Sequence, residues 1–107
     1  MATTFSPTKL SKILSSLRVP LGQVVITAAI DQWTREAQVW GHIQGALFNQ
    51  HMRADWGEVG SEDWASNNQA LRDGGRLLSA YTIEGRKVWI ITEADRSSTT
   101  ILFPEDY

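Results

Sequence analysis

Residues 77–92 of the chain read LLSAYTIEGRKVWIIT, and this stretch decides the fold. Two β-prone runs, 77–83 and 86–92, flank the dipeptide Glu84-Gly85. A two-residue connection that contains glycine is typical of a tight β-hairpin turn. The stretch therefore predicts two antiparallel strands with Ile83 paired to Arg86.

This register places apolar side chains on both faces of the hairpin, because successive residues of a strand point to opposite sides. The two sets are Leu77, Tyr81, Val88 and Ile90 on one face and Leu78, Ala80, Trp89 and Ile91 on the other. A sheet that is covered on one side only alternates more cleanly between apolar and polar residues. We therefore expect the second face to be covered as well, either by residues 6–18 or by a partner.

The rest of the chain adds one strand after the hairpin and a strand with several helices before it. A strand over 99–103 follows the loop 94–98, and Pro104 ends it. The apolar, β-branched run 21–26 predicts a short strand. Helical spacing then predicts helices over 28–38, 40–53 and 61–72. The expected fold class is α+β, with a short N-terminal strand and three to four helices followed by a three-stranded antiparallel β-meander.

Residues 6–18 have the pattern of an amphipathic helix. Ser6-Pro7 supplies an N-cap and a proline at the first helical position. One apolar stripe then follows at spacings of three and four residues, namely Leu10, Ile13, Leu14 and Leu17. We expect one domain over 1–107, in which residues 1–18 form an N-terminal helical extension.

Composition excludes several classes of protein. The 107 residues are 42% hydrophobic and 21% charged, as in an ordinary globular protein, and they contain no cysteine. Disulfide frameworks and thiolate metal sites are therefore excluded, and a cytoplasmic location is expected because no signal-peptide or membrane-spanning run is present. The net charge of −2 gives no general attraction to nucleic acid. A basic patch could form only from Lys9, Lys12 and Arg18.

The acidic pair Glu93 and Asp95 is the first candidate for chemistry, since paired carboxylates can bind a divalent metal or exchange protons. Arg96 is adjacent to the pair, and a guanidinium in this position pairs with a carboxylate more often than it leaves one free. We therefore expect Arg96 to pair with a carboxylate and order this loop. The sequence predicts no catalytic, cofactor-binding or metal-binding residues.

Two further candidates lie upstream. His51 could be grouped with Asp55, Glu58 and Asp63, but no metal-binding spacing such as H-E-x-x-H is present, so structural or solvated roles are expected. Trp56 lies in a predicted connection, and tryptophan is enriched among the residues that dominate protein interfaces. Trp56 is therefore the candidate anchor for a partner.

From about Leu21 onward the chain resembles a family of small bacterial proteins found on plasmids, prophages and integrated elements, some of them labelled restriction-modification subunits. The motifs that carry the resemblance are LGQVV at 21–25, His51 followed by DWG at 55–57, LRDGGRLL at 71–78, WIITEADRS at 89–97 and TTILFPEDY at 99–107. Residues 6–18 are longer than the lead-in of the family, and 31–50 match poorly. The resemblance implies a genomic setting and a fold. It does not imply a methyltransferase, because 107 residues cannot hold that domain.

Together these features predict a non-enzymatic protein-binding module of a mobile element, an inhibitor of a host nucleic-acid defence such as CRISPR–Cas or restriction. Small size, acidic balance and surplus tryptophan suit a protein that covers another protein's surface. The predicted partner-binding residues are Asp55, Trp56, Glu58, Glu93, Asp95 and Arg96. Two alternatives stay open. One is a metal-dependent, nuclease-like enzyme that uses Glu93, Asp95, Asp55 and His51, and the other is a nucleic-acid-binding accessory factor.

Overall fold

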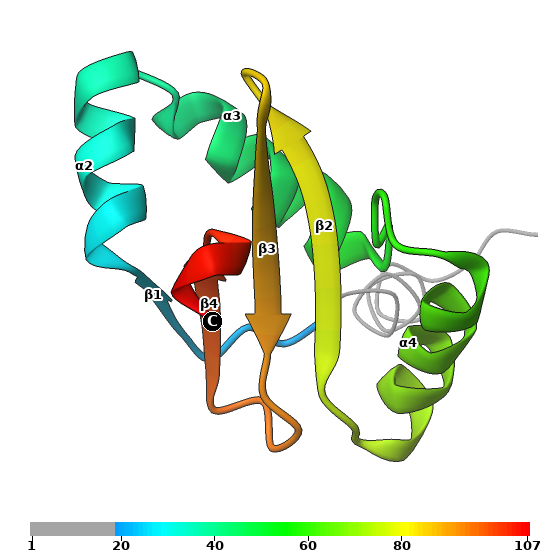
Figure 1. The fold of residues 1–107 in the computed structure, drawn as a ribbon. Helices are drawn as coiled ribbons and strands as arrows, with labels where there is room; N and C mark the ends of the chain where they lie inside the picture. Colours follow the sequence, from blue (N-terminus) through cyan, green and yellow to red (C-terminus); the bar gives the residue numbers. More distant parts are fainter. Residues whose placement is uncertain (1–18) are drawn as a thin grey trace, which may run out of the picture.

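The computed structural model describes residues 19–107, and the helix predicted over 6–18 lies outside these residues. A four-stranded sheet of order β1-β4-β3-β2 forms the centre of the fold (Figure 1). Its strands are β1 (Gln23–Ile26), β2 (Leu77–Ile83), β3 (Arg86–Thr92) and β4 (Ser98–Leu102). The α-helices are α2 (Ala28–Ala37), α3 (Trp40–Gly45) and α4 (Ser61–Asp73). No helix within 19–107 is long and apolar enough to span a membrane.

The hairpin of β2 and β3 confirms the predicted bounds and register. Ile83 pairs with Arg86 and Leu77 with Thr92. Glu84 and Gly85 have φ angles of 48° and 78°. A two-residue turn whose central residues both have positive φ has the twist that matches paired strands, which is why this dipeptide sets the register.

The prediction of a three-stranded antiparallel meander is wrong, because β1 joins the sheet. It pairs in parallel with β4, with Gln23 opposite Ser98 and Ile26 opposite Ile101. Just before β1, the Thr99 hydroxyl donates to the Leu21 carbonyl at 2.8 Å. Gly22 has a φ of 62°, and a Cβ there would lie 2.4 Å from the Ser97 carbonyl carbon. Glycine therefore permits the close approach that turns the meander into a mixed sheet.

The single helix predicted over 40–53 is also corrected. Its turns change type along its length, from α3 to the π-helical segment η1 (Ala46–Gln50) and the 3₁₀ segment η2 (His51–Arg53). Ile43, Leu47 and His51 are buried, whereas Phe48 is exposed. A π-helical turn shifts the phase of the side chains that follow it, so this segment can direct His51 inward and still leave Phe48 outside.

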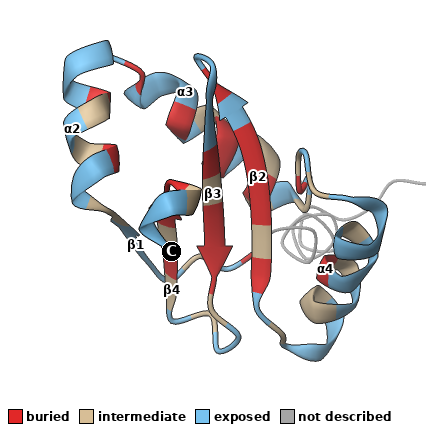
Figure 2. Ribbon diagram, viewed as in Figure 1, coloured by how far each residue is buried: buried red, intermediate tan, exposed pale blue. Residues whose placement is uncertain are grey.

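The main core lies on the sheet face that carries Tyr81, Val88, Ile90 and Ile101, against Ile30 of α2 and neighbouring apolar residues (Figure 2). The second face is covered in part within residues 19–107, and its Leu78 and Trp89 are only half-buried. Ala80, Ile91 and Leu102 are buried there. After the 3₁₀ segment η3 (Pro104–Asp106), the Tyr107 ring packs edge-on to Trp89 at a centroid distance of 5.9 Å. Tyr107 therefore contributes a part of the cover on this face.

Candidate functional site

Trp56, the predicted partner anchor, lies in the core. Its side chain is fully buried with Val19 and Leu77, and its Nε1 donates to Asn68 Oδ1 at 2.9 Å. Its ring also packs edge-on to His51. A residue that anchors a partner must be exposed, and the Trp56 side chain is not exposed in this structure.

The neighbours of Trp56 stabilise the connection between η2 and α4. The Asp55 carboxylate accepts from the Gly57 N–H at 3.1 Å, and the Asp55 carbonyl accepts from the Tyr81 hydroxyl at 2.6 Å. Glu58 accepts from Thr82 at 2.7 Å and from Lys87 at 3.1 Å. These hydrogen bonds hold the pKa of the Glu58 carboxyl below its usual value. Asp55 and Glu58 keep exposed carboxylates, but both also hold this connection in place.

The loop between β3 and β4 does not contain the predicted ion pair with Arg96. The Arg96 guanidinium instead donates to main-chain carbonyls, at 2.5 Å to Gly75 and 3.0 Å to Ala70. These carbonyls lie at the C-terminal end of α4, where the helix dipole favours a positive charge. The prediction that Arg96 pairs with a carboxylate is therefore wrong, because its partners are main-chain carbonyls.

The two acidic residues of that loop have separate neighbours. Glu93 forms an ion pair with Arg76, with 3.5 Å between Glu93 Oε1 and Arg76 Nε. The Asp95 carboxylate accepts from the Ser97 N–H at 2.9 Å, and bonding to Ser97 lowers the pKa of Asp95. Glu93 and Asp95 lie at the β3–β4 loop, whereas Asp55 and Glu58 lie beside β2. The structure thus distributes the predicted acidic residues over two places.

His51 is fully buried in a chain of hydroxyl groups. Its Nδ1 lies 2.6 Å from Ser79 Oγ and its Nε2 lies 2.8 Å from Thr92 Oγ1. The Thr92 hydroxyl lies 2.8 Å from that of Thr99, which donates onward to the Leu21 carbonyl. Since Thr99 gives its proton to a carbonyl, Thr92 must donate to Thr99, and His51 Nε2–H must donate to Thr92.

This order of donors assigns the neutral Nε2–H tautomer to His51, with Nδ1 accepting from Ser79. Burial, reinforced by the nearby Arg96 charge, lowers the pKa of His51 from 6.5 to about 4. A Ser79–His51 pair at 2.6 Å has the spacing of a nucleophile and its base. Both side chains are fully buried, so no substrate can reach them. The chain of hydrogen bonds instead joins Leu21, just before β1, to β4, β3, β2 and η2.

The two edge strands of the sheet, β1 and β2, differ in how far their outward main-chain groups are hydrogen-bonded. Along β2, the Asn67 side chain bonds the N–H and the C=O of Leu78, and Trp56 and Glu58 bond the N–H and the C=O of Ala80. The outward main-chain groups of Leu78 and Ala80 on the β2 edge are therefore already hydrogen-bonded. At the other edge, β1 pairs with β4 on one side, through the N–H groups of Gln23 and Thr27 at its two ends. By strand alternation the main-chain groups of Val24 and Ile26 face outward, and no other strand among residues 19–107 pairs with them.

An apolar groove adjoins this open edge. It has a volume of about 310 Å³ and lies between β1 and the helical segment 40–48. Its lining residues are Val24, Ile26, Trp40, Ile43, Gln44, Leu47, Phe48 and Ile101. We call this feature the β1 groove. Val24 is 38% exposed, Trp40 41% and Phe48 46%, so large apolar side chains stand open to solvent.

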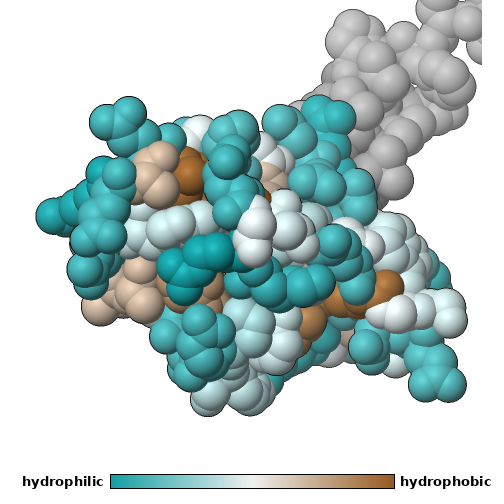
Figure 3. All heavy atoms as spheres, turned by 45° about the horizontal axis from the view of Figure 1, so that its top comes forward, coloured by the Kyte–Doolittle hydropathy of each residue, from teal (hydrophilic) through white to brown (hydrophobic). Residues whose placement is uncertain are grey.

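The face drawn in Figure 3 is mainly hydrophilic, with small separate apolar patches. A groove with seven apolar residues among its eight lining residues differs from that pattern. Exposed apolar surface that is gathered in one concave place is typical of a binding site.

Comparison of the chain with protein-family models, with curated proteins and with solved structures finds no match. The resemblance to plasmid and prophage proteins therefore stays a prediction from the motifs, and the site has to be judged on its own geometry.

The metal-dependent alternative lacks a ligand set in this geometry. Within residues 19–107, no group of three or more His, Cys, Asp or Glu side chains is placed to hold a metal ion. His51 uses both ring nitrogens in hydrogen bonds to hydroxyls. The residues that were grouped for this role, Glu93, Asp95, Asp55 and His51, thus have other contacts.

Sequence reasoning missed the β1 groove. Val24 and Val25 were expected to be strand residues, and Trp40 was expected at the start of a helix. The available signal was the absence of polar alternation in 21–26 together with Phe48, which follows the buried Leu47 directly. The groove depends on the parallel pairing of β1 with β4, which no local pattern indicates.

Proposed function

We propose that the chain is a non-enzymatic protein-binding module and that the β1 groove is its binding surface. One observation carries the proposal. The same short strand has outward main-chain groups that no other strand among residues 19–107 pairs with, and it borders a groove with exposed Trp40 and Phe48. Tryptophan and other aromatic side chains in a concave site are the usual anchors of a protein interface.

The geometry favours a partner that contributes an extended segment. Such a segment can add to the β1 edge through main-chain hydrogen bonds, while its alternate side chains enter the groove beside Val24 and Ile26. Main-chain pairing supplies affinity for any strand, and the apolar groove selects the side chains that fit. The partner is thus a protein with an exposed apolar strand or loop.

We further propose that this partner belongs to a nucleic-acid defence system of a bacterial host, such as CRISPR–Cas or restriction. This part rests on the resemblance to proteins of plasmids and prophages. Asp55 and Asp95 have exposed carboxylates that can face a basic surface, whereas Glu58 and Glu93 already lie beside Lys87 and Arg76. A target of this kind places the chain in the cytoplasm.

Plating of a phage tests the inhibitory role. Expression of the chain in a bacterium with an active restriction or CRISPR–Cas system should raise the plating efficiency of a phage that the system attacks. The strain without the system is the control and should show no change. Val24→Glu should abolish the gain, because it places a charge in the apolar groove. Unchanged plating in every system tried would remove the inhibitory role and leave the binding surface to be tested separately.

A further inference from the structure

The outer edge of β1 presents four main-chain groups in a fixed order. Gln23 and Thr27 direct their N–H groups toward β4. Successive residues of a strand alternate in direction, so the N–H and C=O groups of Val24 and Ile26 point outward. No strand among residues 19–107 pairs with them. In Figure 1, α2 leaves β1 at the end of the strand, so this helix does not cover the edge.

Antiparallel pairing with β1 of a second copy would satisfy all four groups in one register. When Val24 lies opposite Ile26 of the copy, Ile26 also lies opposite Val24 of the copy, and each pair exchanges two main-chain hydrogen bonds. The next register in either direction sets one of the two residues opposite itself and the other opposite Gly22 or Ala28. Gly22 has a φ of 62° and Ala28 begins α2, so neither continues the strand.

The same register covers the exposed valines of β1. Val24 and Val25 are both 38% exposed, and they lie on opposite faces of the strand. Val25 comes directly opposite Val25 of the copy, in a non-hydrogen-bonded pair, where side chains approach most closely. Val24 lies beside Ile26 of the copy on the face with the β1 groove. A partner that only fills the groove would leave Val25 exposed.

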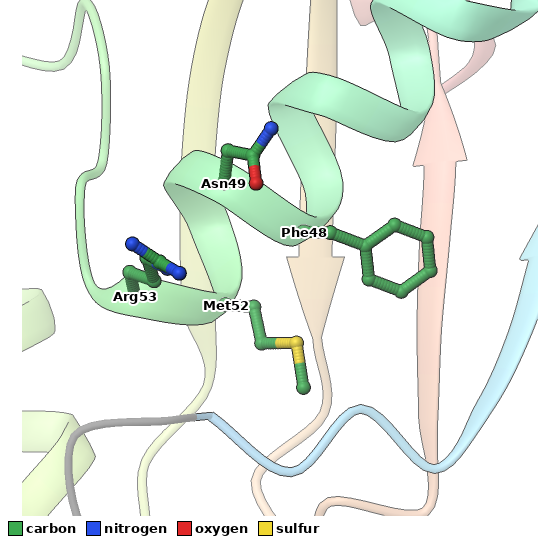
Figure 4. Close-up of a pocket in the computed structure, with 4 residues that line it drawn as sticks. All are labelled: Phe48, Asn49, Met52 and Arg53. Atoms are coloured by element: carbon green, nitrogen blue, oxygen red, sulfur yellow. The ribbon is translucent and has the colours of Figure 1, made fainter. Parts of the chain in front are cut away.

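The surface around this edge carries no charge that would repel a copy. Residues 19–30, which include β1, and residues 39–50, which border the groove, contain no Asp, Glu, Lys or Arg. Proteins commonly protect an edge strand from self-pairing with a charged residue or a proline in the strand, and β1 has neither. In Figure 4, Phe48 points toward the sheet. The hollow of about 270 Å³ that Phe48 also borders includes Asn49 and Arg53, so the surface is more polar beyond Phe48.

We infer that a second copy of the chain binds the open edge of β1, in antiparallel register around Val25, and joins two four-stranded sheets into one of eight strands. The inference rests on the proposed function in that both use the β1 edge, and β1 is itself the exposed apolar strand which that function requires of a partner. It adds regulation, because a foreign strand must displace the second copy. The apparent affinity for such a partner therefore falls as the concentration of the chain rises.

Sedimentation velocity of the full chain over a wide range of concentrations tests for the second copy, since small interfaces associate weakly. The native chain should pass from monomer to dimer as its concentration rises. Val25→Glu and Val25→Lys should each stay monomeric while folded by circular dichroism, because like charges lie directly opposite each other. An equimolar mixture of these two variants should form the dimer again. Gln69→Glu, on the exposed surface of α4, is the control and should dimerise as the native chain does.

Cysteine substitution tests the register, and the chain has no native cysteine. Val25→Cys lies directly opposite its own copy. Gln23→Cys, on the same strand and face, lies about 14 Å from its own copy at the usual strand rise. In a glutathione redox buffer, Val25→Cys should form several-fold more disulfide-linked dimer than Gln23→Cys.

A native chain that stays monomeric at every concentration would overturn the inference. Native-strength dimers of Val25→Glu and Val25→Lys, a mixture of the two that stays monomeric, or equal disulfide yields at the two cysteine positions would overturn it as well. These measurements use the purified chain alone, so their failure leaves the binding of a foreign protein intact. Failure to capture a foreign protein likewise leaves the second copy in place.

Discussion

Trp56→Ala should destabilise the fold by about 3–5 kcal/mol, the range found when a fully buried tryptophan is truncated. The substitution removes a ring that packs with Val19, Leu77 and His51, and it leaves the Asn68 carbonyl oxygen without its donor. Small domains have a total stability of about 5–15 kcal/mol. The variant should therefore be mostly unfolded under mild denaturing conditions, as urea unfolding followed by circular dichroism will show.

Trp40→Ala provides the matched control, because Trp40 is 41% exposed and lies on the groove. Its unfolding free energy should fall by much less than that of Trp56→Ala. Equal and small losses for the two variants would show that Trp56 is not a core residue. It would then return as a candidate anchor for a partner.

Acid should weaken the fold through His51. The folded chain keeps His51 neutral down to a pKa of about 4, whereas the unfolded chain binds a proton near 6.5. Between these values the unfolded state holds more protons, so the unfolding free energy rises with pH across this window. The contribution is fully present above pH 6.5 and is lost as the pH falls toward 4, by about 3 kcal/mol in all.

Urea unfolding at pH 7 and pH 4.5 tests this dependence. His51→Gln should be less stable than the native chain at pH 7, because it breaks the bonds to Ser79 and Thr92. It should also lose much less stability than the native chain between the two pH values. His42→Gln is the control and should keep the native dependence, since His42 is exposed and lies outside the buried network. A His51→Gln variant with the full native dependence would contradict the role given to His51.

The local parts of the fold could be predicted from the sequence. Glu84-Gly85 and the two runs beside it contain the turn and the register of the hairpin, because both depend on residues that are close in the chain. The helix bounds near 28–38 and 61–72 follow from apolar spacing in the same way. Contacts between distant residues were not predictable. The pairing of Gln23 with Ser98, and the bonds from Arg96 to the end of α4, leave no periodic pattern.

The same contrast between local patterns and contacts of distant residues applies to the candidate site. Trp56 stands in a connection without regular spacing, so its sequence context could not distinguish burial from exposure. His51 was expected to have a structural or solvated role, and its partners Ser79 and Thr92 could not be predicted because they are far away in the chain. The β1 groove needs the parallel strand, the π-helical turn and the exposed Phe48 together. Its detection therefore required the structure.

The claim that the β1 groove binds a protein can be tested with two neighbouring residues of one strand. Val24 and Val25 are both 38% exposed, but only Val24 lines the groove. Affinity capture from a bacterial lysate is carried out with the native chain, Val24→Glu and Val25→Glu, and captured proteins are quantified by mass spectrometry. At least one protein should be retained by the native chain and Val25→Glu and be lost with Val24→Glu. Equal retention by all three chains, or equal loss from both variants while they stay folded, would contradict the claim.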